Sequence, residues 1–231
     1  MANNETVMQM LAEIGKIIRN THVVYSSGRH GSTFINKDAL YVHVQTISKL
    51  CKLMAADYDA DQIDVVIGPT MGGAVLAQWM AFHLNARRSA GETLPAFAEK
   101  LGEGENKRFI IKRGYDSVIP GKTVVVVDDL LTTGASSSKV IQGVRKLQGK
   151  VIGLSVICNR GSVEPQNVGG VPIHALTNVT LDSWSEEECP LCRDGVPINT
   201  NFGRGKAFFE ERGVAVLSGR KRIRKEKAPT D

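Results

Sequence analysis

The sequence has no long apolar run and few cysteines, and each scarcity excludes a class of protein. No stretch among its 231 residues approaches the roughly eighteen apolar residues of a transmembrane helix, and the N-terminus lacks a short apolar core behind a basic stretch. Four cysteines are too few for a disulfide framework in a chain of this length. We therefore expect a soluble, cytoplasmic protein with no membrane association.

The composition is that of one enzyme domain, with 42% hydrophobic and 23% charged residues. We expect this domain to cover residues 1–218. The net charge of +5 arises mainly in residues 219–231, which we expect to be a solvated, disordered tail, with RNA or membrane-surface contact the less favoured interpretation. The basic residues of this tail are Arg220, Lys221, Arg222, Arg224, Lys225 and Lys227.

Hydrophobic periodicity predicts alternating strands and helices. The strands are expected at residues 23–25, 33–36, 63–68, 95–98, 123–127 and 151–158, and the helices at 7–18, 40–58 and 72–84. This order predicts an α/β fold with a doubly wound parallel sheet. Residues 100–106, with two glycines and four charges, predict a mobile loop, and residues 107–114 a hairpin that returns from it.

Residues 124–136 are the most informative part of the chain, because they join an apolar strand to a polar turn. Four valines without polar alternation are typical of a strand covered on both faces. Open parallel sheets bind ligands beyond the carboxyl ends of their strands, which is where Asp128 and Asp129 fall. Two carboxylates suit neighbouring ribose hydroxyls, because an ionised carboxylate only accepts hydrogen bonds. An ordinary strand-turn-helix junction is the alternative interpretation.

The small, hydroxyl-rich residues 132–136 suit a phosphate, because backbone N–H groups and a helix N-terminus can approach the anion there. Residues 68–73 form a second glycine-rich turn at a strand end. Neither turn has the glycine pattern of an NAD or ATP site. Two anion-binding turns and two carboxylates predict a sugar with phosphates at both ends, as in phosphoribosyl pyrophosphate (PRPP). Such chemistry requires no nucleophilic triad, and the sequence shows none.

Residues 128–136 resemble the PRPP-binding loop of the type I phosphoribosyltransferases. The resemblance implies that Asp128, Asp129 and Lys100 are catalytic, that Mg²⁺ binds mainly through the substrate phosphates, and that hood segments at about residues 1–40 and 180–218 accompany the domain. The expected PRPP-binding residues are Thr70, Met71, Gly72, Gly73, Lys100, Asp128, Asp129, Leu130, Leu131, Thr132, Thr133, Gly134, Ala135 and Ser136.

From about residue 25 to residue 203 the chain is similar to orotate phosphoribosyltransferases. The likeness rests on Ser27-Gly28-Arg29-His30, on residues 34–38 and on Asn159-Arg160-Gly161. It implies transfer of the phosphoribosyl group from PRPP to orotate, with Thr132, Arg160 and Phe34 contacting orotate, in a homodimer. A guanidinium suits the orotate carboxylate, although Arg160 in a surface salt bridge is the alternative.

The chain departs from the enterobacterial form of this family at positions that carry positive charge. Ser26 and Met71 stand where that form has lysines, and Glu103 stands at the second lysine of its loop, while Lys107, Lys112 or Arg113 could supply the charge. Two alternative functions therefore stay open: a PRPP-dependent transferase for another base, such as a purine, and a non-enzymatic PRPP-sensing regulator that binds nucleic acid. We expect nucleic-acid binding to be absent.

Cys189 and Cys192 have the spacing of half a zinc site or of a redox pair. Four-ligand zinc needs two further ligands, and none follows at a suitable spacing, while His174 is distant in sequence. We therefore name no firm metal ligand and expect a structural or oxidisable turn, with zinc as the weaker candidate. Cys51 and Cys158 lie in apolar segments and are expected in the core.

Overall fold

The computed structural model describes residues 4–13, 17–25, 27–36, 40–102 and 108–213. Most of the expected loop and the whole basic tail thus lie outside the described residues. The described chain forms two compact units, one from residues 4–13 and 40–180 and the other from residues 17–36 and 181–213. Within these residues, no helix is both long enough and apolar enough to cross a membrane.

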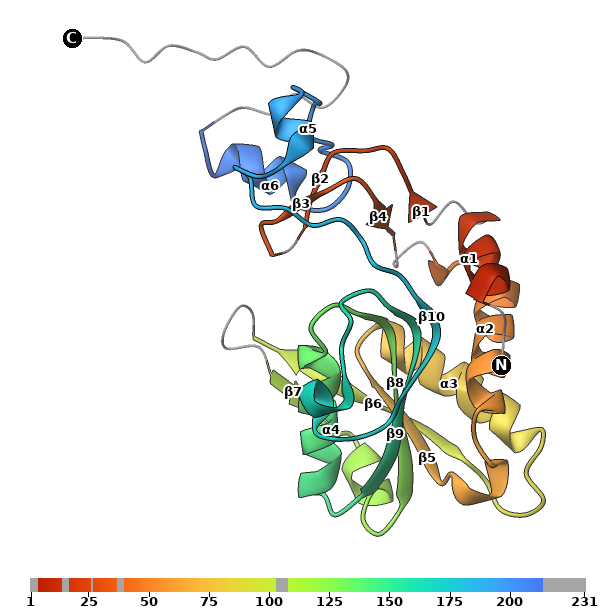
Figure 1. The fold of residues 1–231 in the computed structure, drawn as a ribbon. Coiled ribbons are helices and arrows are strands. Elements are labelled where there is room, and N and C mark those ends of the chain that lie inside the picture. Colours follow the sequence, from red (N-terminus) through yellow and green to blue (C-terminus); the bar gives the residue numbers. More distant parts are fainter. Residues whose placement is uncertain (1–3, 14–16, 26, 37–39, 103–107, 214–231) are drawn as a thin grey trace. The chain divides into compact units, whose positions relative to one another are not determined.

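The first unit is built on a six-stranded sheet with the order β10-β9-β8-β5-β6-β7 (Figure 1). All neighbouring pairs are parallel except β6 and β7, which form the expected hairpin. The strands are β5 (Val65–Pro69), β6 (Leu94–Leu101), β7 (Arg108–Ile110), β8 (Thr123–Leu131), β9 (Lys150–Asn159) and β10 (Ile173–Asn178). The expectation of a doubly wound α/β fold is confirmed.

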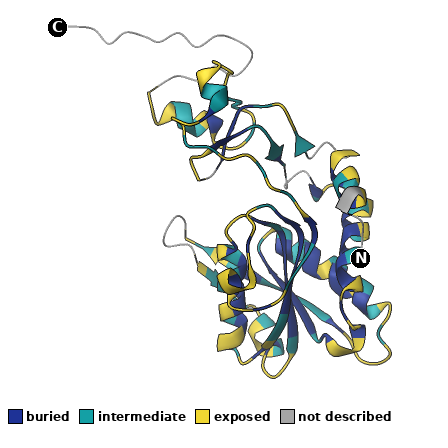
Figure 2. Cartoon of the chain, in the orientation of Figure 1, coloured by how far each residue is buried: buried dark blue, intermediate teal, exposed yellow. Residues whose placement is uncertain are grey.

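Helices cover both faces of this sheet (Figure 1). They are α1 (Asn4–Glu13), α2 (Val44–Ala56), α3 (Gly72–Asn85) and α4 (Ala135–Lys146), and the short 3₁₀ turns are η2 (Ala60–Gln62), η4 (Tyr115–Val118) and η5 (Pro165–Val168). Val124 and Val126 of β8 share a core with α4, whereas the alternating Val125 and Val127 are buried outside that cluster. The valine run is therefore apolar throughout because both of its faces are covered (Figure 2).

The second unit interleaves a segment near the N-terminus with one near the C-terminus. Its elements are β1 (Ile17–Ile18), β2 (Val23–Val24), β3 (His30–Gly31), β4 (Phe34–Ile35), α5 (Pro190–Arg193) and α6 (Gly205–Glu210). β1 pairs with β4 and β2 pairs with β3, both antiparallel. Backbone bridges from His22 to Ile198 and from His30 to Trp184 join the two segments.

Several expected boundaries differ, among them those of α2, which was expected at residues 40–58 and spans Val44–Ala56. Three further differences follow from strand pairing. The first helix ends at Glu13, and Ile17–Ile18 form β1, because pairing with β4 outweighs their helical spacing. Lys100 lies in β6 rather than in a loop, because it pairs with Phe109 of β7. Finally, β8 continues past the valines to Leu131, since its neighbour β9 pairs with it as far as Asn159.

Candidate active site

The two glycine- and hydroxyl-rich turns meet at the switch point of the sheet. β5 has β6 on one side and β8 on the other. The chain therefore continues from β5 to β6 and β7 on one side and then crosses to β8 on the other side of β5. The β5–β8 pairing ends at Ile67 and Val126, after which the turn that begins at Gly68 follows β5 and the carboxylates follow on β8. Ligands of open α/β sheets bind at this kind of position.

Asp128 and Asp129 are both buried and make different hydrogen bonds. Oδ2 of Asp128 accepts a 2.7 Å bond from the Ser137 hydroxyl in α4, and Oδ1 accepts from the Asp129 backbone N–H. Oδ2 of Asp129 accepts a 2.6 Å bond from the hydroxyl of Tyr41. Because successive strand residues point to opposite faces, the two carboxylates are held from opposite sides of β8. Buried carboxylates that accept such bonds are positioned before a ligand arrives.

The expected phosphate loop runs from the end of β8 into the start of α4. Gly134 has φ of +73° and precedes Ala135, the first residue of α4. A Cβ at Gly134 would lie 2.7 Å from Val168 and 2.9 Å from Val163, so this residue must be glycine for steric as well as conformational reasons. Thr132, Thr133 and Ala135 are exposed, with Ser136 partly so. The loop therefore presents small residues and a helix N-terminus to an anion.

Leu130 and Leu131 belong to the strand part of the expected PRPP segment. Leu130 is partly buried, and Leu131 is 1% exposed in the core under α4. A side chain that is this buried in an apolar cluster contributes packing. These two residues therefore contribute to the site by positioning the backbone on either side of them.

The second turn is closed by contact between two glycines. A Cβ on Gly68 would lie 2.6 Å from Cα of Gly73, and one on Gly73 would lie 2.8 Å from Cα of Gly68. The Thr70 hydroxyl accepts a 3.0 Å hydrogen bond from the backbone N–H of Lys100. Met71, at the position expected for a pyrophosphate contact, is 83% exposed. The turn and the expected catalytic lysine are thus held together by a hydrogen bond that the sequence did not reveal.

Tyr41 is a site residue that the sequence analysis missed. Its hydroxyl bonds to Asp129, and a Cβ on Gly72 would lie 2.0 Å from that hydroxyl and 2.7 Å from Oδ2 of Asp129. Tyr41 therefore lies where the carboxylate strand and the second turn come together. A single tyrosine at the start of the helix expected at residues 40–58 carries no sequence signal for this role.

Arg160 and Thr132, two of the expected orotate contacts, are neighbours in the structure. Nε of Arg160 donates a 3.0 Å hydrogen bond to the Thr132 hydroxyl, and its backbone N–H donates to the carbonyl of Leu131. A Cβ on Gly161 would overlap the Thr132 carbonyl, so the end of β9 packs closely on the phosphate loop. The third expected contact, Phe34, lies in the second unit, where its ring stacks on Phe202 at 5.6 Å. Its role toward orotate stays a prediction.

Two of the basic residues considered as substitutes for the missing lysines form ion pairs with a nearby glutamate. Glu99 pairs with Lys112 at 2.8 Å and also with Arg113. The hydrogen bonds from Lys112 and then Arg113 hold the pKa of Glu99 below its usual value. This carboxylate balances one of the two positive charges, which weakens the idea that both residues replace a pyrophosphate-binding lysine. The third, Lys107, lies outside the described residues.

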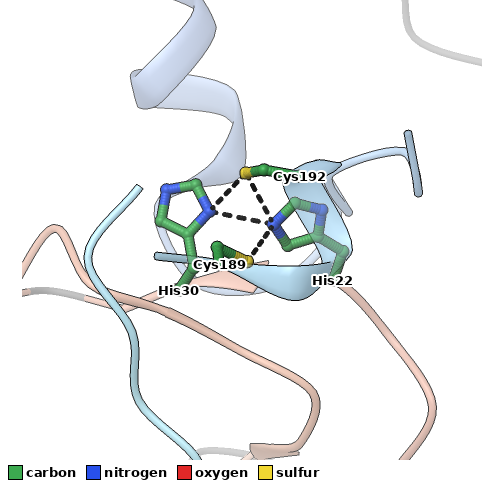
Figure 3. A group of neighbouring side chains, drawn as sticks. All are labelled: His22, His30, Cys189 and Cys192. Carbon is green, nitrogen blue, oxygen red and sulfur yellow. Dashed lines mark hydrogen bonds between the residues drawn. The ribbon is translucent and has the colours of Figure 1, made fainter. Parts of the chain in front are cut away.

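The structure corrects the expectation that Cys189 and Cys192 lack further ligands nearby. His22 and His30, more than 150 residues earlier, place their ring nitrogens beside both sulfurs (Figure 3). Burial, and then His22, lower the pKa of His30, and burial raises the pKa of the Cys192 thiol to about 11. Spacing along the chain did not find these histidines, because ligands can come from segments that only the fold brings together. Cys51 and Cys158 are in the core, as expected.

Comparison with known proteins agrees with this geometry. A family model described as a phosphoribosyl transferase domain matches residues 38–171. The chain is 31% identical over 196 residues to the orotate phosphoribosyltransferase of Caldanaerobacter subterraneus subsp. tengcongensis, covering 84% of this chain and 94% of that protein. It is 35% identical over 178 residues to the orotate phosphoribosyltransferase of Pelotomaculum thermopropionicum, covering 76% and 85%.

A solved structure shows the same architecture. The crystal structure of orotate phosphoribosyltransferase from Aeropyrum pernix has a TM-score of 0.60 and 25% sequence identity to this chain, covering 74% of it and 93% of that chain. The matched family region contains both turns, Asp128, Asp129, Lys100 and Arg160. The chain therefore belongs to the phosphoribosyltransferase family, within which its named relatives are orotate phosphoribosyltransferases.

Proposed function

We propose that the protein transfers the 5-phosphoribosyl group of PRPP to orotate, giving orotidine 5′-monophosphate and pyrophosphate in pyrimidine biosynthesis. The observation that carries the proposal is the contact of Asp129, Tyr41 and Gly72. It brings the carboxylates and phosphate loop of β8 against the glycine turn of β5. A ligand that spans these features needs two hydroxyls between two phosphate groups, which is the chemistry of PRPP.

In the proposed reaction, a ring nitrogen of orotate bonds to the anomeric carbon as the bond from that carbon to pyrophosphate breaks. The pyrophosphate leaves with the bonding electrons, and the nitrogen releases its proton to the solvent. The sugar becomes oxocarbenium-like, so the protein mainly positions the reactants and stabilises the departing charge. Asp128 and Asp129 would accept hydrogen bonds from the ribose hydroxyls, and residues 132–136 would bind the 5-phosphate at the start of α4.

Lys100 would stabilise the leaving pyrophosphate. It is exposed on β6, and its backbone is joined to Thr70 of the second turn. An ammonium group acts as a point charge toward phosphate and needs no fixed bidentate geometry. Arg160, held by Thr132 next to the phosphate loop, would bind the orotate carboxylate through its planar guanidinium.

The donor set fits Mg²⁺, because this ion prefers oxygen ligands and keeps few protein contacts where a substrate supplies phosphates. The residues that would hold it, partly through the bound ribose and pyrophosphate, are Asp128 and Asp129. When bound, the ion would neutralise part of the charge of the leaving pyrophosphate. The proposals of a homodimer and of a cytoplasmic enzyme rest on the family resemblance, and light scattering after size-exclusion chromatography tests the first of them.

The test is the absorbance change of orotate during incubation with PRPP and Mg²⁺. Asp128→Asn and Asp129→Asn keep the side-chain shape and remove the charge, while Asp116→Asn, on an exposed turn, is the matched control. We expect orotate consumption by the wild type and the control, and losses of about tenfold to a hundredfold in kcat/KM for each site variant. Circular dichroism verifies folding of each variant.

Two outcomes would refute the proposal. Absence of orotate consumption by folded wild-type protein would exclude this acceptor, and adenine, guanine and hypoxanthine would then be assayed by pyrophosphate release. Full activity of both aspartate variants would place the reaction elsewhere on the molecule.

A further inference from the structure

The interior of the second unit contains a compact group of metal-ligating atoms. His22, His30 and Cys189 are 2% exposed or less, Cys192 is partly buried, and one ligand atom from each lies within 4.8 Å of all the others. Nε2 of His22 is 3.6 Å from Sγ of Cys189 and 3.7 Å from Sγ of Cys192. Nδ1 of His30 is 3.4 Å from Sγ of Cys192 and 2.9 Å from Nε2 of His22 (Figure 3).

The hydrogen bonding of His22 orients its ring for coordination. Nδ1 lies 2.7 Å from the carbonyl oxygen of Val196, and because a carbonyl only accepts, Nδ1 carries the proton. Nε2 is therefore unprotonated and lies next to the two sulfurs and His30, where its lone pair is available to an ion (Figure 3). A metal-binding imidazole generally donates its other N–H to a carbonyl or carboxylate in this way, which fixes the tautomer and the ring orientation.

The distances agree with tetrahedral zinc. Zinc bonds of about 2.05 Å to nitrogen and about 2.3 Å to sulfur place nitrogen and sulfur ligands about 3.6 Å apart and two nitrogen ligands about 3.3 Å apart. Three of the four nitrogen-sulfur distances, 3.4, 3.6 and 3.7 Å, match this spacing, and the fourth, from His30 to Cys189, is within 4.8 Å. The two ring nitrogens, 2.9 Å apart, would have to separate by a few tenths of an ångström around an ion.

The backbone brings two ligands from the β2–β3 hairpin and two from the turn at the start of α5. In the hairpin, Val24 pairs with His30, so His22, two residues before Val24, shares a face of the hairpin with His30. Cys189 precedes the short helix α5 and Cys192 lies in it, which turns both sulfurs toward one point. Two ligands from a hairpin and two from a Cys-x-x-Cys turn are a common composition for structural zinc.

The second unit also has a small hydrophobic core. Its buried apolar residues among those described are Val23, Val24, Tyr25, Ile35 and Cys189. Units of this size bury little surface, and small units of this kind are often stabilised by a disulfide or a metal. In this unit two imidazoles and a thiol occupy the interior, and they belong to the two segments that the unit must hold together.

We propose that His22, His30, Cys189 and Cys192 bind one Zn²⁺ ion that joins the two segments of the second unit. All four positions of a tetrahedral ion are filled by protein side chains, so the site is structural and has no open position for a substrate. Imidazole and thiolate ligands select zinc over magnesium and calcium, which prefer oxygen. The site is thus separate from the phosphoribosyl chemistry and does not depend on the proposed function.

The test begins with the metal content of the full-length protein, expressed with added zinc and purified without chelators. Elemental analysis by inductively coupled plasma mass spectrometry should find about one zinc ion per chain. Cys192→Ser should lower the zinc content to a small fraction of this value, and Cys51→Ala, at a buried cysteine outside the group, should not change it. Cys192→His preserves a ligand at the position and should restore most of the zinc.

A second measurement does not depend on the folding of a variant. Wild-type protein is stripped with a chelator under reducing conditions and titrated with Co²⁺. A tetrahedral site with thiolate ligands should give intense visible bands that saturate at about one equivalent and disappear on addition of Zn²⁺. The stripped protein should unfold at a lower temperature than the zinc-loaded protein, because binding free energy adds to folding free energy.

Three results would overturn the proposal. The first is wild-type protein without zinc that also gives no tetrahedral Co²⁺ spectrum, which would leave a hydrogen-bonded group of histidines and thiols. The second is a disulfide between Cys189 and Cys192 in freshly isolated protein, found as a mass two hydrogens lower than that of the reduced chain. The third is equal zinc content in the wild type and Cys192→Ser, which would place the ion elsewhere.

Discussion

The hydroxyl of Tyr41 donates a 2.6 Å hydrogen bond to Oδ2 of Asp129, although 88 residues separate the two along the chain. The same hydroxyl packs so closely on Gly72, in the turn after β5, that a Cβ at this position would lie 2.0 Å from it. This contact joins the carboxylates to the second anion-binding turn.

Tyr41→Phe should therefore impair PRPP use selectively. It removes one donor to a buried carboxylate, a loss of about 1.5–3 kcal/mol, so kcat/KM for PRPP should fall by about tenfold or more. The KM for orotate should change little. Steady-state kinetics with Tyr115→Phe, whose ring packs on Phe97, as the control would check this. Tighter PRPP binding by Tyr41→Phe would show instead that the hydroxyl competes with the substrate.

Gly72→Ala should disrupt the same contact sterically. The added Cβ would lie 2.0 Å from the Tyr41 hydroxyl and 2.7 Å from Oδ2 of Asp129, so the tyrosine would have to move. We expect kcat/KM for PRPP to fall by about tenfold or more. Gly143→Ala in α4 is the control, since its Cβ would be 3.5 Å from Ile111 and should stabilise the helix by up to about 1 kcal/mol. Equal activities of the two variants would contradict the site geometry.

Lys100→Ala should lower kcat more than it raises the KM for orotate. If the ammonium stabilises the leaving pyrophosphate, its loss should decrease kcat by about a hundredfold, with partial recovery in Lys100→Arg. The matched control is Lys122→Ala, an exposed lysine just before β8, at the amino end of the parallel strands. A full rate for Lys100→Ala would remove this residue from the catalytic group.

Arg160→Ala should weaken orotate binding, because a guanidinium that faces a carboxylate is lost. We expect the KM for orotate to rise by about tenfold to a hundredfold, and Arg160→Lys to recover only part of it, because the ammonium cannot form the bidentate contact. Arg145→Ala, whose guanidinium donates to the carbonyl of Gly169, is the control. If orotate saturation were unchanged in Arg160→Ala, the base would be recognised by other residues.

The ion pairs of Glu99 with Lys112 and Arg113 should make the stability of the first unit depend on pH in the acidic range. Lys112 first, and then Arg113, lower the pKa of Glu99 from its usual value of 4.5. The stability that it contributes is therefore present above about pH 4.5 and is lost as the pH falls through the lower folded pKa. Glu99→Gln should show a shallower loss of stability over this acidic range, measured by urea unfolding, than the exposed control Glu92→Gln. Parallel curves for the two variants would contradict the pairing.

Residue patterns over a few positions predicted the strands and turns that depend on those residues alone. The valine run of β8 is typical of a strand in a parallel sheet, and the glycine-rich turn after β5 is typical of an anion-binding turn at a strand end. From them followed the doubly wound sheet and the family. The boundaries failed where pairing decided them, as for Ile17–Ile18 in β1 and Lys100 in β6.

By itself, the amino-acid sequence determined the fold class, most strands and helices of the first unit, and the two turns and carboxylates that lie at one edge of the sheet. It did not predict the edge strand β10 (Ile173–Asn178). The tertiary structure alone decided which side chains from other parts of the chain meet. These contacts are Tyr41 with Asp129, Glu99 with Lys112 and, in the second unit, the two histidines with the Cys189–Cys192 pair. The physical reason is that periodicity and turn chemistry act over a few residues. These contacts instead join segments that become neighbours only when strands pair and the core is buried.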